Sequence, residues 1–424
     1  MSPRCHHHVF SVTQRLLVAF KPAFPLPCVI NMNERLDFFM QTKTTKSRRI
    51  EIFDGMRGLA AIIVMVFHLI VMVEAGHASN ASLDFKNKLW AIFTLTPLKL
   101  LWAGNEAVIL FYIIGGFVIA KPYIEGRRID FIAFVKKRFS RLILPYWLIL
   151  IVTLICIALF SSLKSTIPLS GSFNIKWSTM PSLFEILAQF LAFDVNMDVT
   201  AGAFWSIVQE WRIALLIPFI AAALSRYSTM RVVAVVALAN WTLNDSFSQL
   251  GGYWGESLSR TNYYFIFFFI GAVLCKHIEQ LRAIVASRPW VRMVSGILLP
   301  FLIPFQWVAA GLGIDLGRRD AMPVTALGIV LLLLVVMETP WLSRLFKQPI
   351  FLYLGKISFS LYLTHTTAIV LFTTVVGQFI EPQWALMLSP AFALGFAALW
   401  YTFVEERLGA VKWPKLHTTK KVLS

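Results

Sequence analysis

The chain has 424 residues, of which 58% are hydrophobic and 14% are charged, and its mean hydropathy is +0.69. This composition excludes a soluble globular protein and predicts an all-α, polytopic membrane protein, because helices satisfy their own backbone polar groups in lipid. The formal net charge of +17 would suit a nucleic-acid partner, but the placement of the charges makes such a partner unnecessary.

Residues 1–49 differ from the rest of the chain. They contain three consecutive histidines, several prolines and an apolar run interrupted by Arg15 and Lys21. We predict a disordered tail; translation from Met32 or Met40 is the alternative, which would make the tail an artefact of the assigned start. Three histidines without further ligands do not complete a metal site, so no metal is expected.

Ten apolar segments follow, and they predict about ten transmembrane helices in one membrane domain, residues 50–407. The expected spans are 58–74, 104–120, 142–161, 204–224, 231–246, 262–277, 291–311, 322–339, 357–377 and 384–404. Residues 408–424 are expected to form a short basic cytoplasmic tail.

Lysine and arginine are distributed unequally between the segments that flank these spans. One alternating set carries 25 of them and the other carries 8. Because positive residues stay on the cytoplasmic side, the first set and both chain termini are expected in the cytoplasm. The first set is 41–56, 121–141, 225–231, 276–292, 340–356 and 405–424; the second is 75–103, 162–203, 247–261, 311–321 and 378–383.

The first expected span contains Arg57 and His68, separated only by apolar residues and glycine, with Asp54 as the expected N-cap. At about 100° per residue, eleven steps come within about 20° of three full turns, so both side chains share one face. His68 then lies roughly 16 Å deeper than Arg57, in a core about 30 Å thick. Each residue alone favours a structural role, but together they indicate a site that binds an anionic ligand and acts on its far end.

Arg138 and Arg141 belong to the basic segment before the third span. Three residues apart, they lie side by side on a helix. Two planar guanidinium groups on one face suit phosphate oxygens. Contact of a cytoplasmic loop with anionic lipid headgroups explains the same charges equally well.

The segment 204–212 lies at the expected external start of the fourth span and contains Trp205, Ser206 and Glu210. A belt of interfacial tryptophan with charges reaching toward water would explain it. A carboxylate at this depth would also position an acceptor hydroxyl or assist proton transfer, so Glu210 is a candidate catalytic group.

The ninth expected span carries Ser358, Tyr362 and His365, whose i, i+4, i+7 spacing places them on one face. A polar stripe on an apolar helix lines a cavity or an interhelical network. His365 is expected to orient other groups, because it has no cationic companion at a fixed spacing.

These segments resemble the membrane acyltransferase-3 family, in the same order and spacing, from about residue 50 to about residue 407. Asp54–Ala60 with His68 is similar to the family's DGxRGxA and Arg-x10-His patterns, and Asn105–Phe117 to its HEAV…FFxxSGF segment. The other matching pieces are Arg138-x-x-Arg141 before Leu-Pro-Tyr, Phe204–Glu210 and Ser358–His365.

Three positions depart from the family pattern. Asn105 stands where many members have histidine, Gly115 where most have serine, and residues 211–214 replace more usual polar and aromatic residues. We expect these departures to affect the acceptor site more than the reaction. The soluble esterase-like domain that is fused to some members is not expected here.

The resemblance implies an O-acyltransferase that transfers groups other than amino-acyl groups. Its donor is expected to be acyl-coenzyme A, usually acetyl-coenzyme A, with its phosphates held from the cytoplasm by Arg57, Arg138 and Arg141. His68 would act as general base or as an acylated relay, and both alternatives stay open. The acceptor is expected to be a hydroxyl of an extracytoplasmic glycan or lipid-linked sugar, oriented with the help of Glu210.

Two other classes of function stay open. A proton-coupled transporter would also use buried histidine, glutamate and arginine, and broken helices with two related halves would favour it. A non-catalytic flippase or scaffold subunit of a glycan-export complex would use the same polar residues for packing alone. In each case we expect a multi-pass protein in the lipid bilayer of a bacterial inner membrane, with glycan-export proteins as candidate partners.

Overall fold

The computed structural model describes residues 32–85 and 87–411, with side chains described from residue 51 onward except at 248 and 318. Every regular element in these ranges is helical, which confirms the all-α prediction. By their internal contacts, Met1–Arg49 and Ile50–Ser424 form separate units. Residues 1–31 of the predicted tail and 412–424 of the basic tail lie outside the described residues, so both tails stay predictions.

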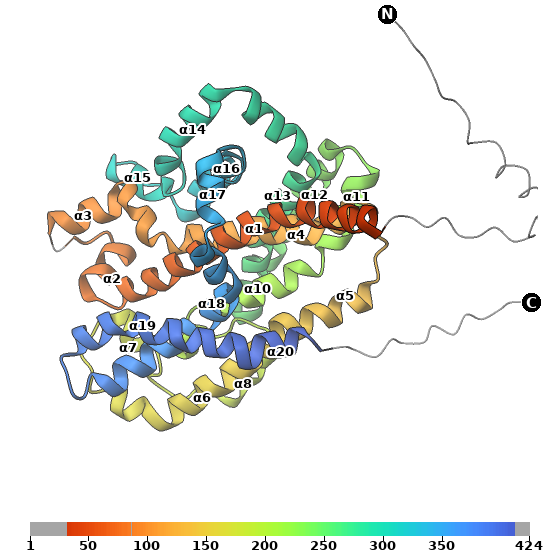
Figure 1. The fold of residues 1–424 in the computed structure, drawn as a ribbon. Helices are drawn as coiled ribbons and strands as arrows, with labels where there is room; N and C mark the ends of the chain where they lie inside the picture. Colours follow the sequence, from red (N-terminus) through yellow and green to blue (C-terminus); the bar gives the residue numbers. More distant parts are fainter. Residues whose placement is uncertain (1–31, 86, 412–424) are drawn as a thin grey trace, which may run out of the picture. The chain divides into compact units, whose positions relative to one another are not determined.

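The helices follow one another through short connections, and α14 and α16 lie on one side of α4 while α6 and α19 lie on the other (Figure 1). The first eleven are α1 (Met32–Val71), α2 (Glu74–Ala81), α3 (Lys88–Leu95), α4 (Gly104–Ile124), α5 (Phe131–Arg138), α6 (Leu144–Lys164), α7 (Gly171–Ile175), α8 (Leu183–Phe190), α9 (Met197–Ala201), α10 (Phe204–Ala214) and α11 (Ile217–Arg226). The others are α12 (Thr229–Leu250), α13 (Gly252–Ser287), α14 (Pro289–Leu302), α15 (Phe305–Gly311), α16 (Arg318–Glu338), α17 (Pro340–Phe346), α18 (Pro349–Val376), α19 (Pro382–Trp400) and α20 (Glu406–Gly409). A 3-10 helix, η1 (Pro97–Trp102), and two π-helical turns, η2 (Phe139–Ile143) and η3 (Tyr401–Glu405), complete the set.

Seven of the described helices are long and apolar enough to cross a membrane, or nine if each of two bent helix pairs counts as one span. The bent pairs are α10 with α11, at 42°, and α14 with α15, at 71°. These nine cover all the expected spans except 231–246. That segment forms α12, which does not qualify, because polar residues such as Asn240, Asn244 and Asp245 lower its apolar content.

Two glycines allow α1 and α18 to cross backbone against backbone. A β-carbon on Gly58 would lie 2.6 Å from the backbone nitrogen of Gly355, and one on Gly355 would overlap the carbonyl oxygen of Asp54. Small residues permit this approach in membrane helix pairs. Ten residues further along each helix, His68 meets His365. The two helices therefore run in the same direction and stay adjacent.

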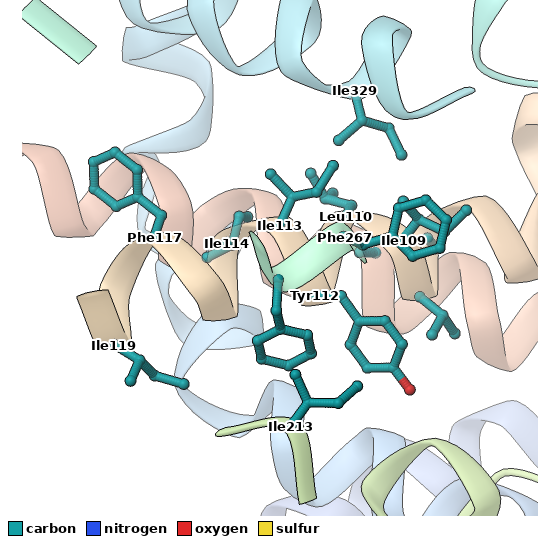
Figure 2. Close-up of a cluster of buried hydrophobic side chains, with 14 of the residues drawn as sticks. Ile109, Leu110, Tyr112, Ile113, Ile114, Phe117, Ile119, Ile213, Phe267 and Ile329 are labelled. Atoms are coloured by element: carbon teal, nitrogen blue, oxygen red, sulfur yellow. The ribbon is translucent and has the colours of Figure 1, made fainter. Parts of the chain in front are cut away.

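A second glycine contact joins α4 to α13, which also run in parallel. A β-carbon on Gly116 would overlap the carbonyl oxygen of Phe268, and one on Gly271 would overlap that of Ile113. Buried apolar side chains fill the space around this pair (Figure 2). Those labelled in the figure are Ile109, Leu110, Tyr112, Ile113, Ile114, Phe117 and Ile119 of α4, Ile213 of α10, Phe267 of α13 and Ile329 of α16.

Replacing Gly116 with alanine is expected to destabilise the protein by about 1–3 kcal/mol, because the new methyl group meets the α13 backbone and overpacks the contact. Thermal unfolding of the detergent-purified protein measures the change. Gly296→Ala in α14 is the matched control, since nothing lies within 4 Å of its β-carbon position. Equal melting temperatures for the two variants would show that the α4–α13 contact does not depend on glycine.

Candidate active site

Two histidines from different helices lie against each other in the membrane domain. The ring centroids of His68 on α1 and His365 on α18 are 5.1 Å apart, with 46° between the ring planes. The Nδ1 of the buried His365 lies 3.0 Å from the carbonyl oxygen of Leu361 and 2.8 Å from that of Tyr362. Since carbonyl oxygens only accept, Nδ1 carries the proton and Nε2 keeps its lone pair. The Thr366 hydroxyl donates to this Nε2 at 3.3 Å.

His68 is half-buried, and its ring makes no hydrogen bond within the described part of the chain. Its second aromatic neighbour is Phe67, at 5.2 Å between centroids, and Phe67 stacks on Trp102 at 6.4 Å. Ring contacts therefore hold the imidazole while leaving its nitrogens available to a ligand.

A lysine that sequence reasoning did not single out approaches this pair from the long connection between α6 and α10. Lys176 is 3% exposed and is close enough to both imidazoles to interact with them electrostatically. Its amine donates to the carbonyl oxygen of Asp198 at 3.5 Å. Burial lowers the pKa of the Lys176 amine, and Asp198 partly opposes this shift. In the sequence, the one feature that distinguishes Lys176 is that it is among the few basic residues of the segments expected outside the cytoplasm.

A small polar cavity lies beside the histidine pair, between α4, α10 and α18. Its volume of about 30 Å³ is room for a water molecule. The hydroxyls of Ser206 and Tyr362 are 2.5 Å apart on its wall, and the Tyr112 hydroxyl donates to the carbonyl oxygen of Ser206 at 3.0 Å. Ser358, whose hydroxyl donates to the carbonyl oxygen of Gly355 at 2.8 Å, also lines it. Tyr362 connects the cavity to His365, because their ring centroids are 6.0 Å apart.

A larger cavity of about 410 Å³ adjoins the small one and is strongly basic. The two cavities share part of their walls, because four side chains line both of them: Arg57, Phe111, Glu210 and Phe359. The cations on its wall are Arg57, Arg127, Arg128, Lys137, Arg138 and Arg141, against the carboxylates of Asp130, Glu210 and Glu405. The predicted trio of Arg57, Arg138 and Arg141 is thus brought to one wall, together with three basic residues that had not been selected.

Glu210 lies elsewhere than expected. It forms an ion pair with Arg138, with 3.5 Å between nitrogen and oxygen, although the sequence pattern assigned the two residues to opposite sides of the membrane. Glu210 lies in the last part of α10, before the bend that leads into α11. The side chains are 21% and 24% exposed, so water reaches the pair only partly.

The expectation that Asp54 caps the first helix is wrong. Helix α1 begins before this residue, so Asp54 has helical backbone and cannot serve as an N-cap, which requires a non-helical one.

Trp205, another predicted site residue, packs on Tyr264 of α13 with 5.0 Å between ring centroids. It does not line either cavity.

The departures from the family pattern fall on both sides of the domain. Gly115 lines the basic cavity, so its effect is expected there and not at the acceptor side. Arg212, within the departing segment 211–214, donates to the hydroxyls of Ser257 and Thr261 at the start of α13. This guanidinium joins α10 to α13 and is a structural link.

Residues 50–404 match the family described as "Acyltransferase domain". The chain belongs to the acyltransferase-3 family. This match covers nearly all the described membrane domain, including the histidine pair and both cavities.

The curated relatives of this chain are distant from it in sequence. Two proteins named as putative O-acetyltransferases, from Staphylococcus aureus strains COL and MSSA476, are each 23% identical over 406 residues, which is 88% of this chain. The matched region spans 60% of the length of each of these relatives. The acyltransferase clz18 of Cochliobolus lunatus is 31% identical over 87 residues, 17% of this chain and 19% of that protein. No solved structure is significantly similar to the chain.

Removing Arg138 is expected to cost more stability than removing Glu210 and Arg138 together, because Arg138→Ala leaves a carboxylate unpaired in a partly shielded cavity. A double-mutant cycle with Arg138→Ala and Glu210→Ala should give a coupling free energy of about 0.5–3 kcal/mol, measured by thermal unfolding. Arg141→Ala, which removes an exposed cation that forms no ion pair with Glu210, is the control and should couple weakly to Glu210. Additive effects of Arg138 and Glu210 would contradict the pairing.

Proposed function

We propose that this protein is a membrane O-acyltransferase that moves an acyl group, acetyl in the simplest case, from cytoplasmic acyl-coenzyme A to a hydroxyl of an extracytoplasmic glycan or lipid-linked sugar. The observation that carries the proposal is the wall that the two cavities share. A basic cavity large enough for a phosphate-rich ligand shares Arg57 and Glu210 with a small, hydroxyl-lined cavity beside the histidine pair. Family membership supports acyl transfer as the chemistry.

Donor binding would use the basic wall. Coenzyme A carries phosphates at one end and the thioester at the other, so the cations would hold the phosphates while the pantetheine arm extends inward. Arg138 and Arg141 provide paired donors for phosphate oxygens, and Arg57 stands where the two cavities meet. Glu210 would keep the Arg138 guanidinium in place by their ion pair.

Acyl transfer would take place near His68. As general base, its free ring nitrogen takes the proton of the acceptor hydroxyl while that oxygen attacks the thioester carbonyl and the thiolate of coenzyme A leaves. As a relay, the same nitrogen attacks the carbonyl first and expels the thiolate of coenzyme A; the acceptor oxygen then takes the acyl group and its proton passes to the released imidazole or thiolate. His365 would position the His68 ring, since its own orientation is fixed by two backbone carbonyls. The Lys176 ammonium would stabilise negative charge that develops on the carbonyl oxygen.

A proton-coupled transporter is the second candidate, and one observation favours it. Two of the candidate spans, α10 with α11 and α14 with α15, are bent, and broken helices are common at transporter binding sites. The two candidates differ in what happens to the thioester. An acyltransferase consumes acetyl-coenzyme A, and a transporter leaves it intact.

The proposal also places the chain in the membrane. Its apolar helices suit a bilayer, and the excess of basic residues on alternate segments would put the basic cavity and both termini in the cytoplasm of a bacterium with this protein in its inner membrane.

The His68→Ala variant is expected to lose at least about 100-fold of the transfer rate, because a positioned acid–base group contributes about 10²–10⁴-fold. Membranes from expressing cells are incubated with radiolabelled acetyl-coenzyme A, and both free coenzyme A and label in the glycan fraction are measured. His277→Ala is the matched control, since this histidine bonds to Thr229 of α12 and lines neither cavity. Normal labelling by a folded, inserted His68→Ala protein would exclude both roles of His68.

Arg141→Gln is expected to raise the KM for acetyl-coenzyme A about tenfold with little change in kcat, because an exposed guanidinium on the cavity wall contributes binding to a distant phosphate and not to the reacting atoms. Arg344→Gln, an exposed arginine outside the cavity, should leave KM unchanged. Equal KM values for the two variants would remove Arg141 from the donor site.

A further inference from the structure

A third cavity, of about 890 Å³, lies apart from the two that form the candidate active site. Residues from α2, α12, α13, α15 and α16 line it. It is within the range of volumes that bind small molecules, and it is the largest of the three. None of its residues was selected from the sequence.

Helix α4 places this cavity at the opposite end of the domain from the basic one. Glu106, near the start of α4, accepts a hydrogen bond from Trp307, which lines the large cavity. Pro122 and Tyr123, near the end of α4, line the basic cavity. Sixteen residues of helix separate Glu106 from Pro122, which is roughly 24 Å. The large cavity is also built from segments poor in lysine and arginine, so it is expected to open on the outer side.

Aromatic faces form part of the wall. Tyr263, Tyr264 and Trp307 line the cavity. Trp307 is held firmly, because its Nε1 donates to Glu106 Oε1 at 3.0 Å and the Lys99 ammonium lies 3.9 Å from the centre of its ring. The indole is only 3% exposed, so it supports the wall from behind, while the half-buried Tyr263 and Tyr264 supply its open ring surface.

Carboxylates lie on the same wall. Glu256 and Asp315 line the cavity, their side chains are exposed, and neither has a partner among the described residues. Ionised carboxylates accept several hydrogen bonds, and they repel a further negative charge placed beside them. Two arginines on the wall are engaged already: Arg260 pairs with Asp194 at 2.7 Å, and Arg319 lies over the ring of Tyr263, 5.6 Å from its centre. Together, these groups favour a neutral ligand with several hydroxyls.

One aromatic layer connects this cavity to the candidate active site. The ring of Tyr264 lies 5.0 Å from that of Trp205 and 5.3 Å from that of Tyr112, between centroids. Tyr112 lines the small polar cavity and donates to the carbonyl oxygen of Ser206. The rings of Tyr264 and Tyr112 therefore separate a ligand in the large cavity from the inner site.

We infer that the large cavity is the acceptor site and that it binds a neutral pyranoside, with its C–H face on the aromatic wall and its hydroxyls donating to Glu256 and Asp315. A pyranose ring has an apolar C–H face and hydroxyls around its edge. The wall offers aromatic rings to the face and carboxylates to the hydroxyls. The inference rests on the proposed function for the role of the sugar as acceptor, and on the cavity alone for its binding.

Binding is tested on the full chain in lipid nanodiscs, because detergents with sugar headgroups would compete. The probes are the methyl glycosides of glucose, galactose, mannose, rhamnose and N-acetylglucosamine, observed by saturation-transfer NMR. At least one glycoside should bind saturably in the millimolar range. The double variant Glu256→Gln, Asp315→Asn should weaken that binding at least tenfold, while Glu381→Gln, an exposed carboxylate outside the cavity, should leave it unchanged.

A second pair of variants tests the aromatic wall. Tyr263→Leu should also weaken binding at least tenfold, and Tyr353→Leu, at an exposed tyrosine outside the cavity, should not. The carboxylate pair lies on the surface, so it reports even if Tyr263→Leu fails to fold. Absence of saturable binding for all five glycosides, or binding unchanged in the carboxylate variant, overturns the inference.

The outcome of the sugar-binding experiment can be distinguished from the outcome of the acyl-transfer experiment. If glycosides bind in the cavity but membranes leave acetyl-coenzyme A intact, the sugar site stands and acyl transfer is excluded. If membranes transfer label normally in the carboxylate variant, acyl transfer stands and the acceptor binds elsewhere.

Discussion

The contact of α1 with α18 is the constraint on which the candidate site depends. A bilayer provides no hydrophobic force between helices, so van der Waals contact over small residues has to hold them together. Gly58 and Gly355 allow that contact backbone to backbone, and the two helices stay adjacent over the next ten residues. His68 and His365 meet for this reason. A larger residue at the crossing would separate the imidazoles without touching either of them.

Charge is segregated along the domain in a way that suits a reaction between two compartments. Charges are costly at the centre of a bilayer, so the cations gather in one cavity that can hold water. The middle of the domain offers hydroxyls and imidazoles, such as Ser206, Tyr362 and His68, which are polar without a permanent charge. The large cavity at the other end of α4 is lined by aromatic and acidic groups. Donor and acceptor would thus approach from opposite ends and meet at uncharged groups.

Sequence patterns identified the candidate reactive residues better than they predicted which of these residues contact one another. Helical spacing correctly placed Ser358 and Tyr362 on one cavity wall, because both positions belong to a single regular helix. The position of Glu210 was misjudged, because its ion pair with Arg138 joins two segments that no local spacing relates. Lys176 and the large cavity had no signal in the sequence. Each depends on connections such as 162–203, whose folded course no local periodicity encodes.

The sequence by itself determined the all-helical membrane class, nine of the spans, the family and the basic segments that meet at one cavity, because apolar length, charge placement and motif spacing are local properties. Only the tertiary structure decided that His68 pairs with His365, that Glu210 pairs with Arg138, and that Trp307 is fixed between Glu106 and Lys99. Those pairings join residues from different helices. They are set by the packing of helices against one another, as at the glycine crossing of α1 and α18, which acts across space and leaves no periodic trace along the chain.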